Sequence, residues 1–152
     1  MYFGRNPCRR LAWHLIKGLV YCQFPKIQSL ATDQLIVWLA SDSPPPVLID
    51  VRQEAEYAVS HLPGARHLPT VEAIQQADLS VDTPLVLYCS VGYRSAHLVN
   101  QLQAAGYNNV MNLEGSIFDW YNQGHPVVAD QLPVQRVHPY NRIWGLLLES
   151  SE

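Results

Sequence analysis

The sequence predicts an α/β fold in which a mainly parallel β-sheet is covered by helices. From residue 27 onward, short apolar runs typical of strands alternate with segments of helical spacing, and this alternation favours parallel strands joined through helices. Two apolar runs end at a polar residue: residues 47–49 are followed by Asp50, and residues 85–88 by Cys89. Ligands bind at the carboxyl edge of such sheets, so we expect both polar residues at that edge.

The predicted elements follow one another closely and can share one core. In chain order they occupy residues 34–40, 47–49, 71–77, 85–88, 95–105, 110–113 and 117–121. The chain has 152 residues, of which 48% are hydrophobic and 15% charged. This length and composition suffice for one sizeable core that needs neither a metal ion nor disulfide bonds.

The segment 95–105 is the helix that follows the predicted site. Its apolar residues recur with a spacing near 3.6, at Leu98, Val99, Leu102 and Ala105. Gly106 is placed to end this helix in a left-handed turn. Arg94 and Ser95 therefore open the helix, directly after the loop that begins at Cys89.

The loop that begins at Cys89 has the features of a site for a thiolate. Backbone N–H groups at a helix N-terminus lack partners within the helix and favour negative charge in the preceding loop. We therefore expect a lowered pKa for Cys89, with Arg94 adding positive charge nearby. Gly92 suits the loop because it permits positive φ and close approach of the backbone. The alternative is an inert, buried cysteine at a strand end.

Three separated stretches of the chain resemble the rhodanese family of sulfurtransferases. They are residues 48–52 with 56–57 and 61–65, then the loop 89–95, then residues 112–117 with Trp120 and 124–126. Together they span most of residues 27–128, in the order that the family shows. The resemblance implies a rhodanese-like three-layer fold, with a central, mainly parallel sheet and helices on both faces.

The resemblance also implies a thiosulfate or persulfide sulfurtransferase that carries sulfur as a persulfide on Cys89. Its donor would be a thiosulfate-like compound, a small persulfide or a protein persulfide, and its acceptor a thiol, cyanide or another protein. This chemistry needs no metal and no other cofactor. Asp50 and Arg52 are expected to support the site as a hydrogen-bond acceptor and an ion-pair partner. The expected anion-binding loop consists of Ser90, Val91, Gly92, Tyr93, Arg94 and Ser95.

The chain departs from related patterns at several positions. Four residues separate Cys89 from Arg94, whereas phosphate or arsenate enzymes of the same fold have five, and the shorter loop favours a sulfur atom over a tetrahedral oxyanion. Ser90 stands where members that favour thiosulfate often carry a basic residue, which weakens the case for thiosulfate and makes a protein persulfide or a small organic persulfide a competing donor. Ser60 and Ser116 replace common glycines, and we expect both to be tolerated because neither lies in the loop.

Charge and cysteine content narrow the possible partners. The formal net charge is −3, and no basic run is interleaved with aromatic residues, so we expect no nucleic-acid partner. The three cysteines, Cys8, Cys22 and Cys89, lack the spacing of a zinc site or a disulfide framework. A reactive thiol favours a reducing compartment, and we expect a cytoplasmic protein.

Both ends of the chain lie outside the resemblance. We expect an N-terminal amphipathic extension (residues 1–26), a rhodanese-like domain (27–128) and a C-terminal extension packed on that domain (129–152). The N-terminal segment has an apolar stripe formed by Leu11, Ala12, Leu15, Ile16, Leu19 and Val20. This helix is too short and too polar to span a bilayer, and we expect it to dock on the domain or a partner rather than on a membrane surface.

Two functions from different classes are therefore compatible with the sequence. The first is a sulfurtransferase with Cys89 as the nucleophile. The second is a rhodanese-like interaction or regulatory module with little turnover, which binds a partner or a membrane surface through its terminal extensions. Solvent access to Cys89 separates the two, because extensions that cover the loop would keep small donors out.

Overall fold

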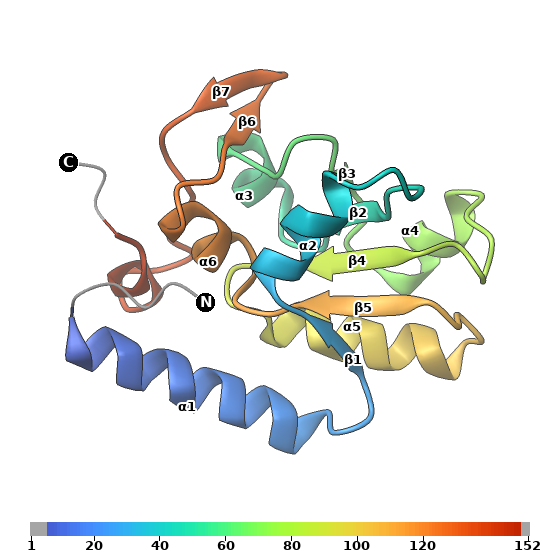
Figure 1. Cartoon of the computed structure of the whole chain (residues 1–152), viewed down its shortest axis with the longest axis horizontal. Coiled ribbons are helices and arrows are strands. Elements are labelled where there is room, and N and C mark those ends of the chain that lie inside the picture. The colour runs from blue at the N-terminus through green and yellow to red at the C-terminus, as the bar shows by residue number, and fades with distance from the viewer. Residues whose placement is uncertain (1–5, 150–152) are drawn as a thin grey trace.

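The protein is built on a five-stranded parallel sheet between two layers of helices (Figure 1). The computed structural model describes residues 6–149, and the outermost parts of both expected extensions lie outside this range. The strand order is β1-β5-β4-β2-β3, and each neighbouring pair is parallel. This sheet confirms the predicted α/β fold. Its strands are β1 (Gln28–Leu30), β2 (Val47–Asp50), β3 (Arg66–His67), β4 (Leu85–Tyr88) and β5 (Val110–Leu113).

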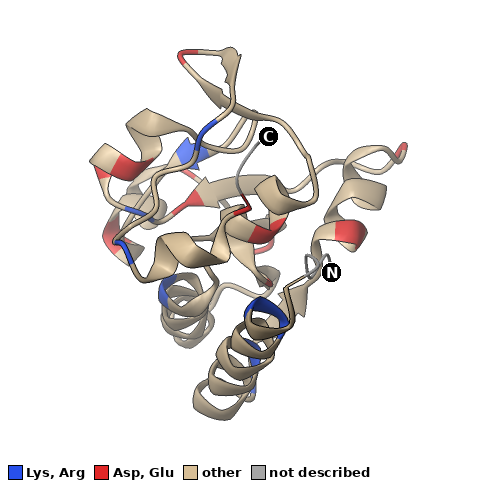
Figure 2. Cartoon of the chain, turned by 90° about the vertical axis from the view of Figure 1, so that its left-hand side faces the viewer, with Lys and Arg blue, Asp and Glu red and all other residues tan. Residues whose placement is uncertain are grey.

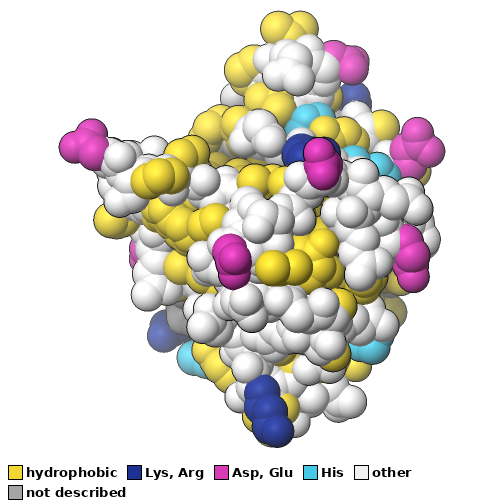
Figure 3. Space-filling view, turned by 90° about the vertical axis from the view of Figure 1, so that its right-hand side faces the viewer, with side chains coloured by type: hydrophobic (Ala, Val, Ile, Leu, Met, Phe, Trp, Pro, Cys, Tyr) yellow, Lys and Arg dark blue, Asp and Glu magenta, His cyan; other side chains and the backbone are white. Residues whose placement is uncertain are grey.

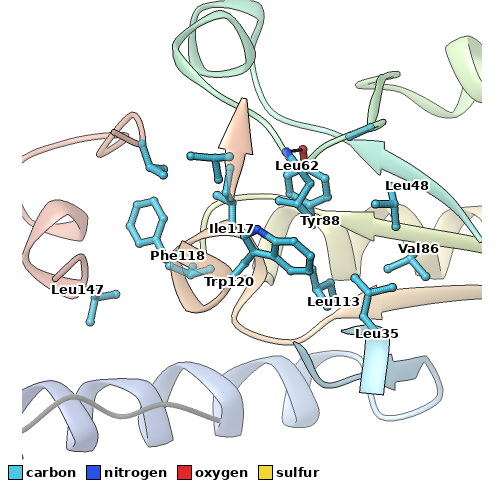
Figure 4. Close-up of a cluster of buried hydrophobic side chains, with 14 of the residues drawn as sticks. Leu35, Leu48, Leu62, Val86, Tyr88, Leu113, Ile117, Phe118, Trp120 and Leu147 are labelled. Atoms are coloured by element: carbon cyan, nitrogen blue, oxygen red, sulfur yellow. Dashed lines mark hydrogen bonds between the residues drawn. The ribbon is translucent and has the colours of Figure 1, made fainter. Parts of the chain in front are cut away.

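Helices cover both faces of the sheet because alternate side chains of its central strands point to opposite sides. Leu48 and Val86 pack in a cluster with residues of α2 and α6 (Figure 4), whereas Ile49 and Leu87 pack in another with residues of α4 and α5. The predicted three-layer arrangement is therefore confirmed. The helices are α1 (Pro7–Gln23), α2 (Thr32–Leu39), α3 (Glu54–Val59), α4 (Val71–Gln76), α5 (Tyr93–Ala104) and α6 (Ser116–Asn122), and a 3-10 turn, η1 (Trp144–Leu147), lies near the C-terminus.

The junction between β4 and α5 has the predicted form, with small shifts at the helix ends. Gly92 has φ of 107° and serves as the N-cap, so the helix begins at Tyr93 rather than at Arg94. It ends at Ala104, and Gly106 has φ of 96° in the left-handed turn expected there. The end of β4 at Tyr88 and the start of α5 at Tyr93 are thus separated by only four residues.

Helix α1 lies along the domain and divides the apolar stripe expected from the sequence. Trp13 and Val20 are buried against the domain, whereas Leu11, Leu15 and Leu19 remain more than half exposed. The stripe therefore does not dock as one surface, because the domain and the C-terminal segment cover only one flank of the helix. Among the described residues, no helix is long and apolar enough to cross a membrane.

The C-terminal segment packs against the N-terminal part of α1. Arg9 Nε donates to the carbonyl oxygen of Leu146 at 3.1 Å, and η1 contacts the helix directly (Figure 1). Before this segment, the hairpin of β6 (Val127–Ala129) and β7 (Leu132–Val134) joins the domain through a bridge between His61 and Val128. The two ends of the described chain are therefore neighbours, and β6 crosses the boundary expected at residue 128.

Two basic residues of α1 help to hold this helix against the rest of the protein. Figure 2 shows the positions of Lys and Arg along its ribbon in blue, and two of these residues form ion pairs with acidic residues of the domain and the C-terminal segment. These pairs join Lys17 to Glu114 at 2.9 Å and Arg9 to Glu149 at 3.4 Å. On the side of the molecule that faces the viewer in Figure 3, acidic side chains are scattered over the surface, and one of them lies beside a basic side chain.

Trp13 is the residue that we expect to hold α1 on the domain. Its side chain is 1% exposed within the main core cluster, so Trp13→Ala should lower the free energy of unfolding by about 3 kcal/mol. Leu15→Ala, two residues further along the helix, where the side chain is 65% exposed, should change it by less than about 0.5 kcal/mol. Urea unfolding of both variants checks this, and equal losses would show that α1 is not anchored through Trp13.

Candidate active site

The candidate site lies at the carboxyl edge of the sheet, where the sequence predicts Asp50 and Cys89. Asp50 is the last residue of β2 and pairs with Tyr88, the last residue of β4. Cys89 follows directly and is 1% exposed. The loop from Cys89 to Gly92 then delivers the chain into α5. The fold therefore brings the cysteine, the glycine and the helix N-terminus to one point.

The sulfur atom of Cys89 lies within a set of hydrogen-bond donors. The Gly92 N–H donates to Sγ at 3.1 Å, and the Ser95 hydroxyl lies 3.5 Å from it. Asn112 holds this arrangement from β5, because its Nδ2 donates to the Gly92 carbonyl at 3.1 Å and its Oδ1 accepts from Ser95 at 2.6 Å. The donors are thus fixed in place before any substrate arrives.

The surroundings of Cys89 favour its thiolate. Burial raises the pKa of a thiol, but the positive charge of Arg94 and hydrogen bonds from Ser95 and Gly92 outweigh it, so the pKa of Cys89 is lowered. This agrees with the direction expected from the sequence. The loop therefore favours the ionised form of the Cys89 thiol, which is the more reactive form of a cysteine.

Arg94 is paired with Glu56, a partner that sequence reasoning did not assign. Arg94 Nη1 and Nη2 donate to the two carboxylate oxygens of Glu56 at 2.9 Å each. Glu56 is 1% exposed, and it also accepts from the Ser90 hydroxyl at 3.1 Å and the Gln53 N–H at 3.0 Å. Burial raises the pKa of Glu56, but its hydrogen bonds to Arg94 and Gln53 outweigh this effect. The net pKa is lowered, so the carboxylate stays ionised.

This pairing changes what the loop side chains offer to an anion. The Ser90 hydroxyl donates to Glu56, and Arg94 Nη2 donates to the Ser90 oxygen at 2.8 Å. Both side chains therefore bind the Glu56 carboxylate, while the Gly92 N–H and the Ser95 hydroxyl contact the sulfur of Cys89. Val91 is buried, and Tyr93 is partly exposed with its ring edge against Phe24. Four residues of the loop thus shape the site, and Gly92 and Ser95 contact Sγ.

Asp50 and Arg52 form a separate buried pair beneath the site. Arg52 Nη2 donates to Asp50 at 2.7 Å and to the Ser60 carbonyl at 2.6 Å, and both side chains of the ion pair are inaccessible. The guanidinium lies 5.8 Å from the centre of the Tyr88 ring. The pair therefore links the end of β2 to Ser60 at the end of α3. Its hydrogen bonds go to these structural partners rather than to the sulfur of Cys89.

The two serines that replace common glycines both make structural contacts. Ser116 has φ of 50°, and its hydroxyl accepts from the Cys89 N–H at 3.1 Å while donating to the Leu113 carbonyl at 3.0 Å. Ser60 donates to the Arg136 carbonyl at 2.7 Å. Ser116 lies outside the loop, as expected, but it holds the first residue of the loop in place.

A cavity of about 260 Å³ opens onto Cys89. Residues of the loop form its floor, and four residues from the two ends of the chain complete its walls. These four are Ile16 and Leu19 of α1 with Tyr140 and Trp144 of the C-terminal segment. The terminal segments therefore border the access route to Cys89 without closing it, a feature that no local sequence signal reveals.

The chain belongs to the rhodanese-like domain family. The family model matches residues 32–123, which include all of β2, β4 and β5 and the Cys89 loop. The family is associated with sulfur transfer, and the site described above has a thiolate-stabilising loop at the position where the resemblance placed it. The terminal segments that wall the cavity lie outside the matched residues.

Individual relatives agree with this assignment. A sulfurtransferase of Allochromatium vinosum is 35% identical over 92 residues, which are 60% of this chain and 86% of that protein. The probable adenylyltransferase/sulfurtransferase MoeZ of Mycobacterium tuberculosis is 33% identical over 109 residues, 68% of this chain but 27% of that longer protein. A rhodanese-like domain protein from Staphylococcus aureus superposes with a TM-score of 0.59 at 28% identity, covering 68% of this chain and 99% of that one. The chain is thus a distant relative of sulfurtransferases.

Removal of the Ser95 hydroxyl tests the hydrogen bonds around the sulfur. In a background without Cys8 and Cys22, Ser95→Ala should raise the pKa of Cys89, because the thiolate loses a donor. The pH profile of alkylation by iodoacetamide should shift to higher pH, with slower reaction at pH 7. Ser43→Ala, at an exposed serine, is the control, and an unchanged profile in Ser95→Ala would contradict the assigned role.

Glu56→Gln tests the carboxylate on which the loop converges. The variant loses the charge that pairs with Arg94, so the free energy of unfolding should fall by about 2 kcal/mol at pH 7. Because the pKa of Glu56 is lowered by folding, the advantage of the wild type should be complete above the ordinary pKa of 4.5 and disappear as the pH falls through the lowered value. Glu54→Gln, at an exposed position of the same helix, should change stability little; equal effects of the two variants would refute this role for Glu56.

Proposed function

We propose that this protein is a rhodanese-type sulfurtransferase that carries sulfane sulfur as a persulfide on Cys89. The observation that supports the proposal most strongly is the contact between the Gly92 N–H and Cys89 Sγ at 3.1 Å, at the start of α5 and with a lowered pKa for the thiol. A thiolate held this way is a nucleophile that also leaves room for a second sulfur atom in the adjoining cavity. Membership of the family and the sulfurtransferase relatives support the same reaction.

The proposed reaction has two steps and needs no metal or redox cofactor. In the first, the Cys89 thiolate attacks the outer sulfur of the donor, the donor S–S bond breaks, and sulfite or a thiol leaves. In the second, a thiol or cyanide attacks the outer sulfur of the persulfide and regenerates the Cys89 thiolate. The persulfide anion formed between the steps is stabilised by the helix N-terminus and the backbone N–H groups of the loop.

Persulfides are the donor class that this site favours over thiosulfate. Glu56 neutralises Arg94 through two hydrogen bonds, and Ser90 adds no charge at the position after the cysteine. A dianionic donor therefore gains little from the loop. We place the reaction in a reducing compartment, the cytoplasm, where the thiol products and acceptors are abundant.

The second candidate is an interaction or regulatory module with little turnover. One observation favours it: Cys89 is 1% exposed, and terminal segments wall the cavity above it while Leu11 and Leu15 of α1 stay exposed. A partner or a membrane surface bound at these leucines would then act through the walls of the cavity. In this case purified protein would accept no sulfur from small donors although its Cys89 could still be alkylated.

Intact-mass spectrometry separates the two candidates. After incubation with thiosulfate or with a small persulfide, the wild type should gain one sulfur atom per chain that a reductant removes, and Cys89→Ser should gain none. Cys8→Ser and Cys22→Ser, at the exposed cysteines of α1, are matched controls that should gain sulfur like the wild type. An equal gain in Cys89→Ser, or no gain in the wild type, would refute the sulfurtransferase mechanism.

A further inference from the structure

The cavity above Cys89 has walls that the family match does not include. Leu19 projects from α1 and Tyr140 from the C-terminal segment, and both lie outside residues 32–123. Leu19 is 54% and Tyr140 is 44% exposed, so each retains free surface beside the opening. These two side chains are therefore placed to touch the body of any molecule whose sulfur reaches Cys89.

The chemical character of this cavity is apolar. Among the described residues that line it, Arg94 is the only charged one, and its guanidinium is held by Glu56 and covered by the Tyr140 ring at 4.7 Å. Aliphatic and aromatic side chains make up the remaining walls beyond the loop. A charged substrate body would lose its hydration here without gaining a partner, whereas an apolar body would bury surface favourably.

Tyr140 is held over the site by a backbone conformation that tyrosine seldom adopts. Its φ is 63°, and its N–H donates to His138 Nδ1 at 3.0 Å. Left-handed conformations of large residues persist only where their surroundings maintain them, and they concentrate at sites that contact ligands. The stacking on Arg94 adds a second constraint. The ring is therefore a fixed wall of the cavity.

We infer that the cavity selects small organic persulfides, R–S–SH, whose R group is apolar, and that Tyr140 and Leu19 determine this specificity. The inference rests on the proposed function. The Cys89 thiolate attacks the outer sulfur of the donor, the S–S bond of the donor breaks, and the leaving R–S⁻ takes the persulfide proton and departs as R–SH. The negative charge ends on the Cys89 persulfide, so the step needs no oxidant or reductant.

The volume of the cavity sets the size of the R group. About 260 Å³ is below the range of pockets that hold drug-sized ligands, so one ring or a short alkyl chain is the expected body. Benzyl persulfide meets this description. Cysteine persulfide is a matched probe, because it has the same reacting group on a body that carries two charges.

The test is the rate at which each probe loads sulfur onto Cys89, followed by intact-mass spectrometry. The wild type should react about tenfold faster with benzyl persulfide than with cysteine persulfide. Tyr140→Ala and Leu19→Ala should lose most of this preference, and Tyr140→Phe should keep it because the ring remains. Leu15→Ala, one turn from Leu19 and outside the cavity lining, is the control and should behave like the wild type.

The possible failures of this test are distinguishable. Equal or faster loading from cysteine persulfide in the wild type, or an unchanged preference in both Tyr140→Ala and Leu19→Ala, would overturn the inference while leaving Cys89 as a sulfur carrier. Absence of loading from both probes and from thiosulfate would overturn the proposed function itself. Far-ultraviolet circular dichroism confirms that each variant is folded, and the exposed positions of Leu19 and Tyr140 make unfolding an unexpected result.

Discussion

The carboxylate of Glu56 is the acceptor on which the geometry of the site depends. It receives both guanidinium nitrogens of Arg94, the Ser90 hydroxyl and the Gln53 N–H. Three separate parts of the chain, α3, the loop and the first turn of α5, are therefore fixed relative to one another. A buried carboxylate of this kind must keep its partners, because an unpaired charge costs several kcal/mol in the interior. Gly92 itself is held from β5, where Asn112 Nδ2 donates to its carbonyl oxygen.

The pairing also determines which groups contact the sulfur of Cys89. Arg94 is close enough to lower the pKa of Cys89, yet its hydrogen bonds are used by Glu56. The guanidinium therefore favours the thiolate through space and leaves the contact with sulfur to the Gly92 N–H and Ser95. Below the site, the pair of Asp50 and Arg52 makes the sheet edge rigid in the same way. A stiff loop suits a persulfide anion, since donors that are already oriented need no reorganisation.

Local sequence patterns predicted the parts of the fold that depend on local spacing. The apolar run 85–88 and the helical spacing of Leu98, Val99 and Leu102 located β4, α5 and the loop between them. The short strands β1 and β3 went unrecognised, because runs of three and two residues carry no period and are defined by their neighbours in the sheet. Glu56 was visible in the sequence as part of the family resemblance, but it lies 38 positions before Arg94, and only folding shows that they meet. The route of the terminal segments to the cavity likewise depends on long-range packing of Trp13 and η1.

The measurement that tests the central claim most directly is sulfur release in a single turnover. Protein carrying a persulfide on Cys89 is freed of donor, cyanide is added, and thiocyanate is measured against the persulfide present. We predict one thiocyanate for each persulfide and the return of Cys89 to the free thiol. A persulfide that remains on Cys89 with no thiocyanate formed would contradict the claim, because the cysteine would then hold sulfur without transferring it.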